Sequence, residues 1–216
     1  MANTRRIKKE STSQMVLKAI KEDIFTKRLL PGQKITLGEL AEQFGVSITP
    51  VREALLALEK EHLVKTTPYK ETVVMGLDEK YIEDSYQIRG ALEGFTVYEV
   101  CREQKDLSEV EERYQVMEQV MREERYGDYS AANRGFHEAI WRASDNMFVC
   151  DMLMPLWINN STAVIKDVKS NAEVSFQEHT ELMQLLRARD AQGARACMEH
   201  HISRSKEDFK RHFQNN

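Results

Sequence analysis

Hydrophobic residues in the first sixty positions recur every three or four residues, which is the spacing of a helix with one buried face. One such run extends from Met15 to Lys27 and stops before the turn signal Leu30-Pro31-Gly32. A second begins after Thr36, a suitable N-cap, and closes at Gly45. Thr49-Pro50 opens a third, because proline is tolerated in a first helical turn. The pattern therefore predicts three short helices.

Two β-prone runs follow these helices, over residues 63–67 and 72–75. They flank the turn Pro68-Tyr69-Lys70-Glu71 and predict a two-stranded wing. Three helices and a wing make a winged helix-turn-helix, which we assign to residues 1–77.

Residues 78–216 contain few prolines or glycines and follow a helical pattern to the end. Pro155 is expected to kink one of the predicted helices. The six predicted helices span 79–104, 106–126, 128–143, 146–168, 173–189 and 191–213. The expected fold class is mainly α: an amino-terminal winged helix-turn-helix and a carboxy-terminal antiparallel six-helix bundle.

The charge of the chain divides along the same boundary. The whole chain of 216 residues has a net charge of −4, but residues 1–70 carry +5 and residues 71–216 carry −9. A basic module beside an acidic one suits a protein in which only the first part approaches phosphates.

Composition excludes several other classes of protein. With 41% hydrophobic residues the chain can bury a core, and it has no apolar run near the ~20 residues of a membrane span. The first ten residues are basic and polar, unlike a secretory signal. Three widely separated cysteines indicate neither a disulfide framework nor a thiolate zinc site. We expect a soluble cytoplasmic protein.

Residues 37–55 have the pattern of a helix-turn-helix whose second helix reads DNA. The predicted third helix is polar in its first turn and apolar on one side afterwards, so the first turn can meet base edges while the apolar stripe packs on the other helices. Such helix pairs also occur as plain core elements. The wing and the basic residues at 5, 6, 8 and 9 favour DNA binding.

This segment resembles the signature of the GntR family of bacterial regulators. The matching residues are Leu40-Ala41-x-x-x-Gly45-Val46-Ser47-x-Thr49-Pro50-Val51-Arg52-Glu53-Ala54-Leu55-x-x-Leu58. The resemblance implies that Arg52 reaches a guanine or a nearby phosphate in the major groove. The alternative is a salt bridge from Arg52 to Glu39 or Glu42.

Other DNA contacts are expected around Arg52. Ser47 and Thr49 are caps that can also donate to phosphate, and Lys34, Tyr69 and Lys70 are candidate contacts to the DNA backbone. Two departures from the family bear on the operator sequence. Ile48 replaces a frequent arginine, and residues 69–71 replace the usual Arg-Gly of the wing tip.

Three histidines of the helical region lie on inward helix faces. His137 shares its face with Asn133, while His179 and His201 each belong to an apolar stripe. They are either three separate core histidines or the lining of one cavity, and their positions on three different helices favour a shared cavity.

The helical region resembles the FCD ligand-binding domain of the FadR-type branch, and its six helices are similar to the VanR-like subgroup. The matching residues are Ile88-Arg89-x-x-Leu92-Glu93-Gly94, Phe136-His137, Glu178-His179 and His201. In many such domains an acid and three histidines hold a divalent metal that accepts a small carboxylate. The resemblance implies that His137, His179 and His201 bind zinc, nickel or manganese, with Asn133 in place of the acid.

An all-neutral ligand set would leave the metal its full positive charge and favour an anionic effector. Arg89 is a candidate effector contact, or it locks helices together through Glu93. We therefore expect an effector-responsive transcriptional repressor that binds a palindromic operator as a homodimer. The alternatives are a metal-dependent hydrolase and an architectural DNA-binding protein without an effector. The sequence contains no hydrolase motif, and the architectural alternative leaves the inward histidines unexplained.

Overall fold

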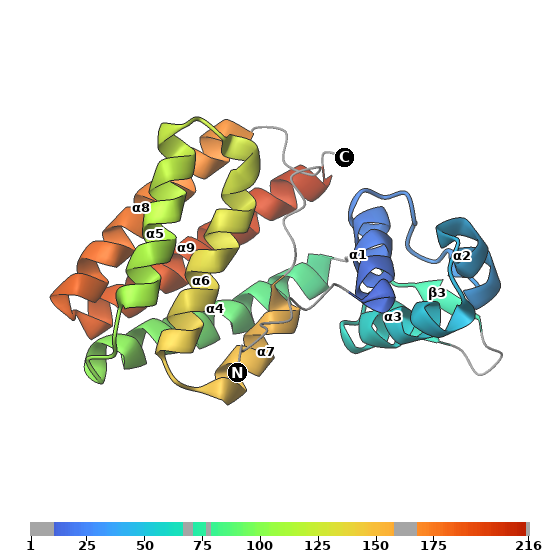
Figure 1. Cartoon of the computed structure of the whole chain (residues 1–216), viewed down its shortest axis with the longest axis horizontal. Coiled ribbons are helices and arrows are strands. Elements are labelled where there is room, and N and C mark those ends of the chain that lie inside the picture. Colours follow the sequence, from blue (N-terminus) through green and yellow to red (C-terminus); the bar gives the residue numbers. More distant parts are fainter. Residues whose placement is uncertain (1–10, 67–70, 77–78, 158–167, 215–216) are drawn as a thin grey trace, which may run out of the picture. The chain divides into compact units, whose positions relative to one another are not determined.

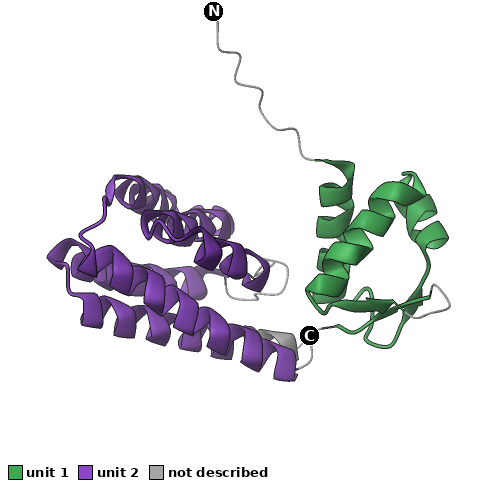
Figure 2. Cartoon of the chain, turned by 90° about the horizontal axis from the view of Figure 1, so that it is seen from below, with its two compact units in different colours: residues 1–78 green, residues 79–216 purple. Residues whose placement is uncertain are grey.

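The computed structural model describes residues 11–66, 71–76, 79–157 and 168–214. The chain divides into two compact units, residues 1–78 and 79–216, as Figure 2 shows. Helices dominate both units, so the expected mainly-α fold class is confirmed.

The first unit contains the three expected helices: α1 (Thr12–Phe25), α2 (Leu37–Phe44) and α3 (Ile48–Lys60). Thr36 caps α2 as predicted, because its side chain accepts from the Glu39 N–H while the Glu39 carboxylate binds the Thr36 N–H. Gly45 ends α2 in the left-handed conformation at φ 63°, which a residue without a Cβ adopts without strain.

A small antiparallel sheet completes this unit. The two wing strands are β2 (Val64–Thr66) and β3 (Thr72–Val74), and a third strand, β1 (Lys34–Ile35), pairs with the other edge of β3. The sequence did not indicate β1, because two residues carry no readable alternation. The predicted DNA contacts Tyr69 and Lys70 lie outside the described residues.

The second unit is a bundle whose described part contains six α-helices and one short 3-10 helix, η1 (Tyr126–Asp128). The helices are α4 (Glu79–Arg102), α5 (Ser108–Arg122), α6 (Tyr129–Ala143), α7 (Met147–Leu156), α8 (Val168–Ala188) and α9 (Ala191–Gln214). In Figure 1, α5 and α6 are neighbours, and α7 lies against α4 at the edge of the bundle.

The predicted fourth helix is wrong in its length. Instead of a kinked helix over 146–168, α7 ends at Leu156, one residue after Pro155, and Trp157 leaves the helical region at ψ 83°. Pro155 lies in the last turn of α7, where it has no N–H to bond to the Asp151 carbonyl and its ring crowds that carbonyl. The next helix among the described residues, α8, begins at Val168, five residues before the expected start.

The three cysteines are free thiols: Cys101 is buried, and Cys150 and Cys197 are partly buried. Within the described ranges, none of the helices is both long enough and apolar enough to cross a membrane.

Candidate functional site

The first site is the exposed start of α3. Val51, Ala54 and Leu58 bury the inner face of this helix, whereas Ile48, Thr49 and Arg52 are exposed on its first turns. The helix thus packs on the unit through one side and presents the polar side chains of Thr49 and Arg52, beside Ile48, on the other. A recognition helix has this division, because the base-contacting turn must stay accessible.

Arg52 makes no ion pair or hydrogen bond with any residue in the described parts of the chain. The alternative bridge to Glu39 or Glu42 is not formed, and Glu39 is engaged with Thr36 instead. Ser47 is the N-cap residue of α3, but its side chain makes no capping hydrogen bond. Both side chains can therefore reach an outside partner.

Lys34 is also exposed, but its ammonium lies 2.8 Å from the Glu71 carboxylate. An exposed pair of this kind contributes little to stability and can exchange for a phosphate.

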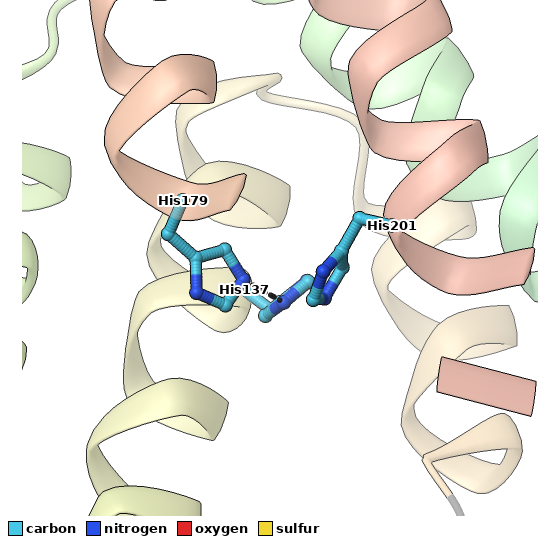
Figure 3. A group of neighbouring side chains, drawn as sticks. All are labelled: His137, His179 and His201. Atoms are coloured by element: carbon cyan, nitrogen blue, oxygen red, sulfur yellow. Dashed lines mark hydrogen bonds between the residues drawn. The ribbon is translucent and has the colours of Figure 1, made fainter. Parts of the chain in front are cut away.

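The second site is the centre of the helical unit, where three histidines meet. His137 comes from α6, His179 from α8 and His201 from α9, and all three are buried. One ring nitrogen from each lies within 4.8 Å of the others, and the Nε2 atoms of His137 and His179 are 3.0 Å apart. Figure 3 shows the three imidazoles converging from separate helices. The three histidines are thus neighbours at one buried centre rather than three separate core residues.

The outward nitrogen of each imidazole has its own partner. The Nδ1 of His137 binds Glu93, and the Nδ1 of His201 lies 2.6 Å from Glu178 Oε2. The Nδ1 of His179 lies 3.0 Å from the hydroxyl of Tyr129, which donates to the Ser175 hydroxyl at 3.1 Å. These oxygens accept from Nδ1–H, so each ring turns its Nε2 atom toward the centre, where those of His137 and His179 are in hydrogen-bond contact.

Glu93 is held by three donors. Arg89 Nε donates at 2.6 Å, Trp141 Nε1 donates at 3.0 Å, and His137 supplies the third bond. Burial alone would raise the pKa of Glu93, but His137, Arg89 and Trp141 outweigh it and lower that pKa to about 2. Glu93 is therefore an ionised carboxylate in the interior.

The guanidinium of Arg89 already has partners within the chain. Its guanidinium binds Glu93 on the same helix and lies 4.0 Å from the centroid of the Trp157 ring. Through Glu93, Arg89 links α4 to His137 and Trp141 on α6, which agrees with the second of the two roles considered above.

Glu178 is arranged in the same way on the other side of the centre. Arg204 donates to both of its carboxylate oxygens, at 2.5 and 2.8 Å. Burial raises the pKa of Glu178, but the bonds from His201 and Arg204 outweigh burial, so the net shift is downward. Two ionised carboxylates thus lie directly behind two of the histidines.

The environment keeps two of the imidazoles neutral. Burial lowers the pKa of His201 to about 4, although Glu178 opposes the shift. Burial also lowers the pKa of His179 well below 6.5, and the neighbouring histidines add to the effect. Neutral imidazoles are the form that binds metal ions.

Asn133 lies one turn before His137 on α6. Its Oδ1 is the one buried side-chain polar atom that lacks a hydrogen-bond partner in the described part of the chain. A buried acceptor without a partner costs free energy, which makes it a candidate for a bound group.

Tyr129 and Glu178 also belong to this centre, although neither was expected there from the sequence. Tyr129, Asn133 and His137 are spaced by four residues, so their shared helix face was a readable signal for Tyr129. The pairing of Glu178 with His201 joins α8 to α9 and could not be read from spacing.

The chain combines a winged helix-turn-helix with a helical domain that has a buried polar centre. This combination indicates the class of bacterial transcriptional regulators. The family model "Bacterial regulatory proteins, gntR family" matches residues 12–74, and the "FCD domain" model matches residues 84–204. The chain belongs to the GntR family and carries an FCD domain, as the sequence motifs predicted.

Named relatives agree with this assignment. The chain is 28% identical over 204 residues to the transcriptional regulator McbR of Escherichia coli, covering 92% of each chain. It is 27% identical to a probable D-xylose utilization operon repressor of Paenarthrobacter nicotinovorans, covering 94% of this chain and 90% of the relative. The structure of E. coli McbR/YncC superposes with a TM-score of 0.73 at 25% identity, covering 95% of this chain and 99% of that one. These proteins are regulators rather than enzymes, so the hydrolase alternative is excluded.

Proposed function

We propose that this chain is a cytoplasmic, effector-responsive repressor that binds a palindromic operator as a homodimer, and that a divalent metal in the helical domain anchors a small carboxylate. The convergence of three buried imidazoles, one of which lies one turn after Asn133 and its orphan oxygen on α6, carries the proposal.

The residues at the centre fit a transition-metal ion. Three Nε2 atoms and one amide oxygen make four ligands, and imidazole suits zinc, nickel and manganese. The oxygens of Glu93, Glu178 and Tyr129 hold the outer ring nitrogens, as in metal sites where such partners orient the ligands. A metal with this ligand set keeps positions open, and there it would attract and polarise an anionic ligand.

Charge favours a carboxylate as the effector. The four metal ligands are neutral, and the two carboxylates behind them are each paired with an arginine, Arg89 or Arg204. The positive charge of the metal is therefore not cancelled locally. We propose that Arg89 acts on the effector site by fixing Glu93, and that it reaches the effector itself only by releasing this partner.

The DNA contacts follow from the exposed start of α3. Arg52 enters the major groove, and Ser47 and Thr49 donate to phosphates. Lys34 leaves Glu71 to bind the DNA backbone. Tyr69 and Lys70 belong to the same proposed interface.

A two-fold dimer doubles the short DNA site that one recognition helix can read. The relative named as a probable operon repressor favours repression as the mode of action. Six α-helices in the described part of the second unit support the VanR-like subgroup.

The test is an operator-release assay. DNA flanking the gene is footprinted, and the labelled operator is titrated with protein while a panel of small carboxylates is added with and without a chelator. The proposal expects one class of carboxylate to release the operator only from metal-loaded protein. Release that is insensitive to the chelator would contradict the metal's role, and operator binding that no small molecule changes would favour an architectural protein.

A further inference from the structure

Ile48 is the first residue of α3, and its apolar side chain is accessible. Its side chain is 48% exposed, whereas Val51 and Leu55, one and two turns further along the helix, are 0% and 4% exposed. The apolar stripe that packs α3 on the unit therefore continues into a turn where burial has ended. Packing of the described residues does not account for a large apolar side chain at this position.

The neighbours of Ile48 are the proposed DNA contacts. Ser47 and Thr49 precede and follow it in sequence, and both are exposed. Arg52 lies one turn later on the same side of the helix, since residues four apart are neighbours on a helix surface. A ligand that meets Ser47, Thr49 and Arg52 therefore also meets Ile48.

The chemistry of isoleucine limits what Ile48 can contact on DNA. Its side chain has no hydrogen-bond donor or acceptor, so it binds neither phosphate nor the polar atoms of a base edge. Base pairs present one apolar group in the major groove, the 5-methyl group of thymine. Contact with this methyl group removes apolar surface from water, which favours binding. Cytosine presents an amino group at that edge, which would lose water without gaining an acceptor.

We propose that Ile48 determines operator sequence by contacting the 5-methyl group of a thymine in each half-site. The inference rests on the proposed function and adds a second base to the guanine that Arg52 reads. Four residues correspond to about 6 Å along a helix, and successive bases of one strand are ~3.4 Å apart. The thymine is therefore expected within about two base pairs of that guanine.

Leu56 offers a matched comparison on the same helix. It is also apolar and is 54% exposed. It follows Ile48 by eight residues, which is about 12 Å along the helix axis. A recognition helix contacts bases mainly through its amino-terminal residues. Leu56 is therefore not expected to reach the same thymine.

The experiment replaces thymine by uracil in the operator, which removes the 5-methyl group and keeps base pairing. Each thymine of the footprinted operator is replaced in turn, in both half-sites together, and full-length protein is titrated by fluorescence anisotropy. At one position uracil should raise the wild-type dissociation constant about 10-fold, because each half-site loses one methyl contact. At that position Ile48→Ala should bind both operators equally, and Leu56→Ala should keep the wild-type difference.

A second arm supplies the methyl group on another base. A C·G pair at the selected position should weaken wild-type binding, and 5-methylcytosine should recover part of the loss. Ile48→Ala should not distinguish the two cytosines. Ile48→Arg should lose the preference for the methyl group and favour guanine there, because a guanidinium donates to O6 and N7 of guanine. Low salt strengthens phosphate contacts, so weakened variants remain measurable.

Two results would overturn the inference while the proposed DNA binding stands. One is a wild type that binds thymine and uracil operators equally at every position. The other is an Ile48→Ala variant that keeps the thymine preference, because another residue or the shape of the DNA would then read the methyl group. A wild type that protects no site in the flanking DNA overturns the proposed function as well. Circular dichroism establishes that each variant is folded.

Discussion

The hydroxyl of Tyr129 on α6 lies 3.0 Å from Nδ1 of His179 on α8. Because Tyr129 donates its own proton to Ser175, the phenol oxygen accepts from the histidine and leaves Nε2 unprotonated toward the centre. A single contact between two helices thus sets which nitrogen of His179 is available to bind a ligand.

Tyr129→Phe removes this acceptor while keeping the ring. We expect metal affinity to fall about 10–100-fold, because partners that orient a ligating histidine typically contribute this much. Competition with a chromogenic chelator measures the change. Tyr126→Phe, on η1, is the matched control and should keep wild-type affinity. Equal affinities for the two variants would show that Tyr129 does not orient His179.

Asn133→Asp adds a negative ligand where an orphan oxygen now lies. The variant should bind a divalent metal more tightly, by at least ~10-fold, because a carboxylate is a stronger ligand than an amide. It should also need more carboxylate effector for operator release, since the charge of the centre falls. Isothermal titration with metal, followed by the release assay, measures both effects. Unchanged metal affinity would place Asn133 outside the metal's ligand set.

Acid should destabilise the metal-free protein. The pKa of His201 is about 4 in the folded chain and 6.5 when exposed, so the unfolded state binds more protons between these values. Stability is therefore full above pH 6.5 and falls as the pH drops toward 4. We expect the melting temperature of chelator-treated protein to fall by about 5 °C or more between pH 7 and pH 5. Scanning calorimetry across this range measures it, and a flat profile would contradict a buried neutral His201.

Arg52→Ala should weaken operator binding by about 1–3 kcal/mol and relax base preference, because Arg52 is exposed and uncommitted within the described residues. Lys60→Ala, at the far end of the same helix, should change affinity less and without altering sequence preference. Fluorescence anisotropy with the operator and with single-base variants compares the two. If Arg52→Ala binds as tightly and selectively as wild type, α3 is not placed in the groove as proposed.

Periodicity was sufficient to locate most helices of this chain. Caps such as Thr36 and Gly45 act locally, so the sequence marks them where they occur. The three histidines could likewise be placed on inward faces, since each face follows from its own helix. The α7 end at Leu156 was missed because the apolar pattern continues past Pro155.

Contacts between helices lay beyond such reasoning. Glu93 binds His137, Glu178 binds His201, and Arg204 binds Glu178. Each of these contacts depends on how two helices pack. For Arg89 the sequence left two roles open, an effector contact or a pairing with Glu93. Only the fold shows that Glu93 and the Trp157 ring are both in contact with it.

The central claim is that His137, His179 and His201 hold a divalent metal, and the metal content of purified protein tests it most directly. His201→Ala and His200→Ala remove adjacent histidines, of which the first is buried at the centre and the second is exposed. Wild-type protein and His200→Ala, purified without chelator and measured by plasma mass spectrometry, should each carry about one zinc, nickel or manganese ion per chain. His201→Ala should carry almost none while remaining folded and able to bind the operator. Wild-type protein that carries no metal and takes up none when it is supplied would contradict the account.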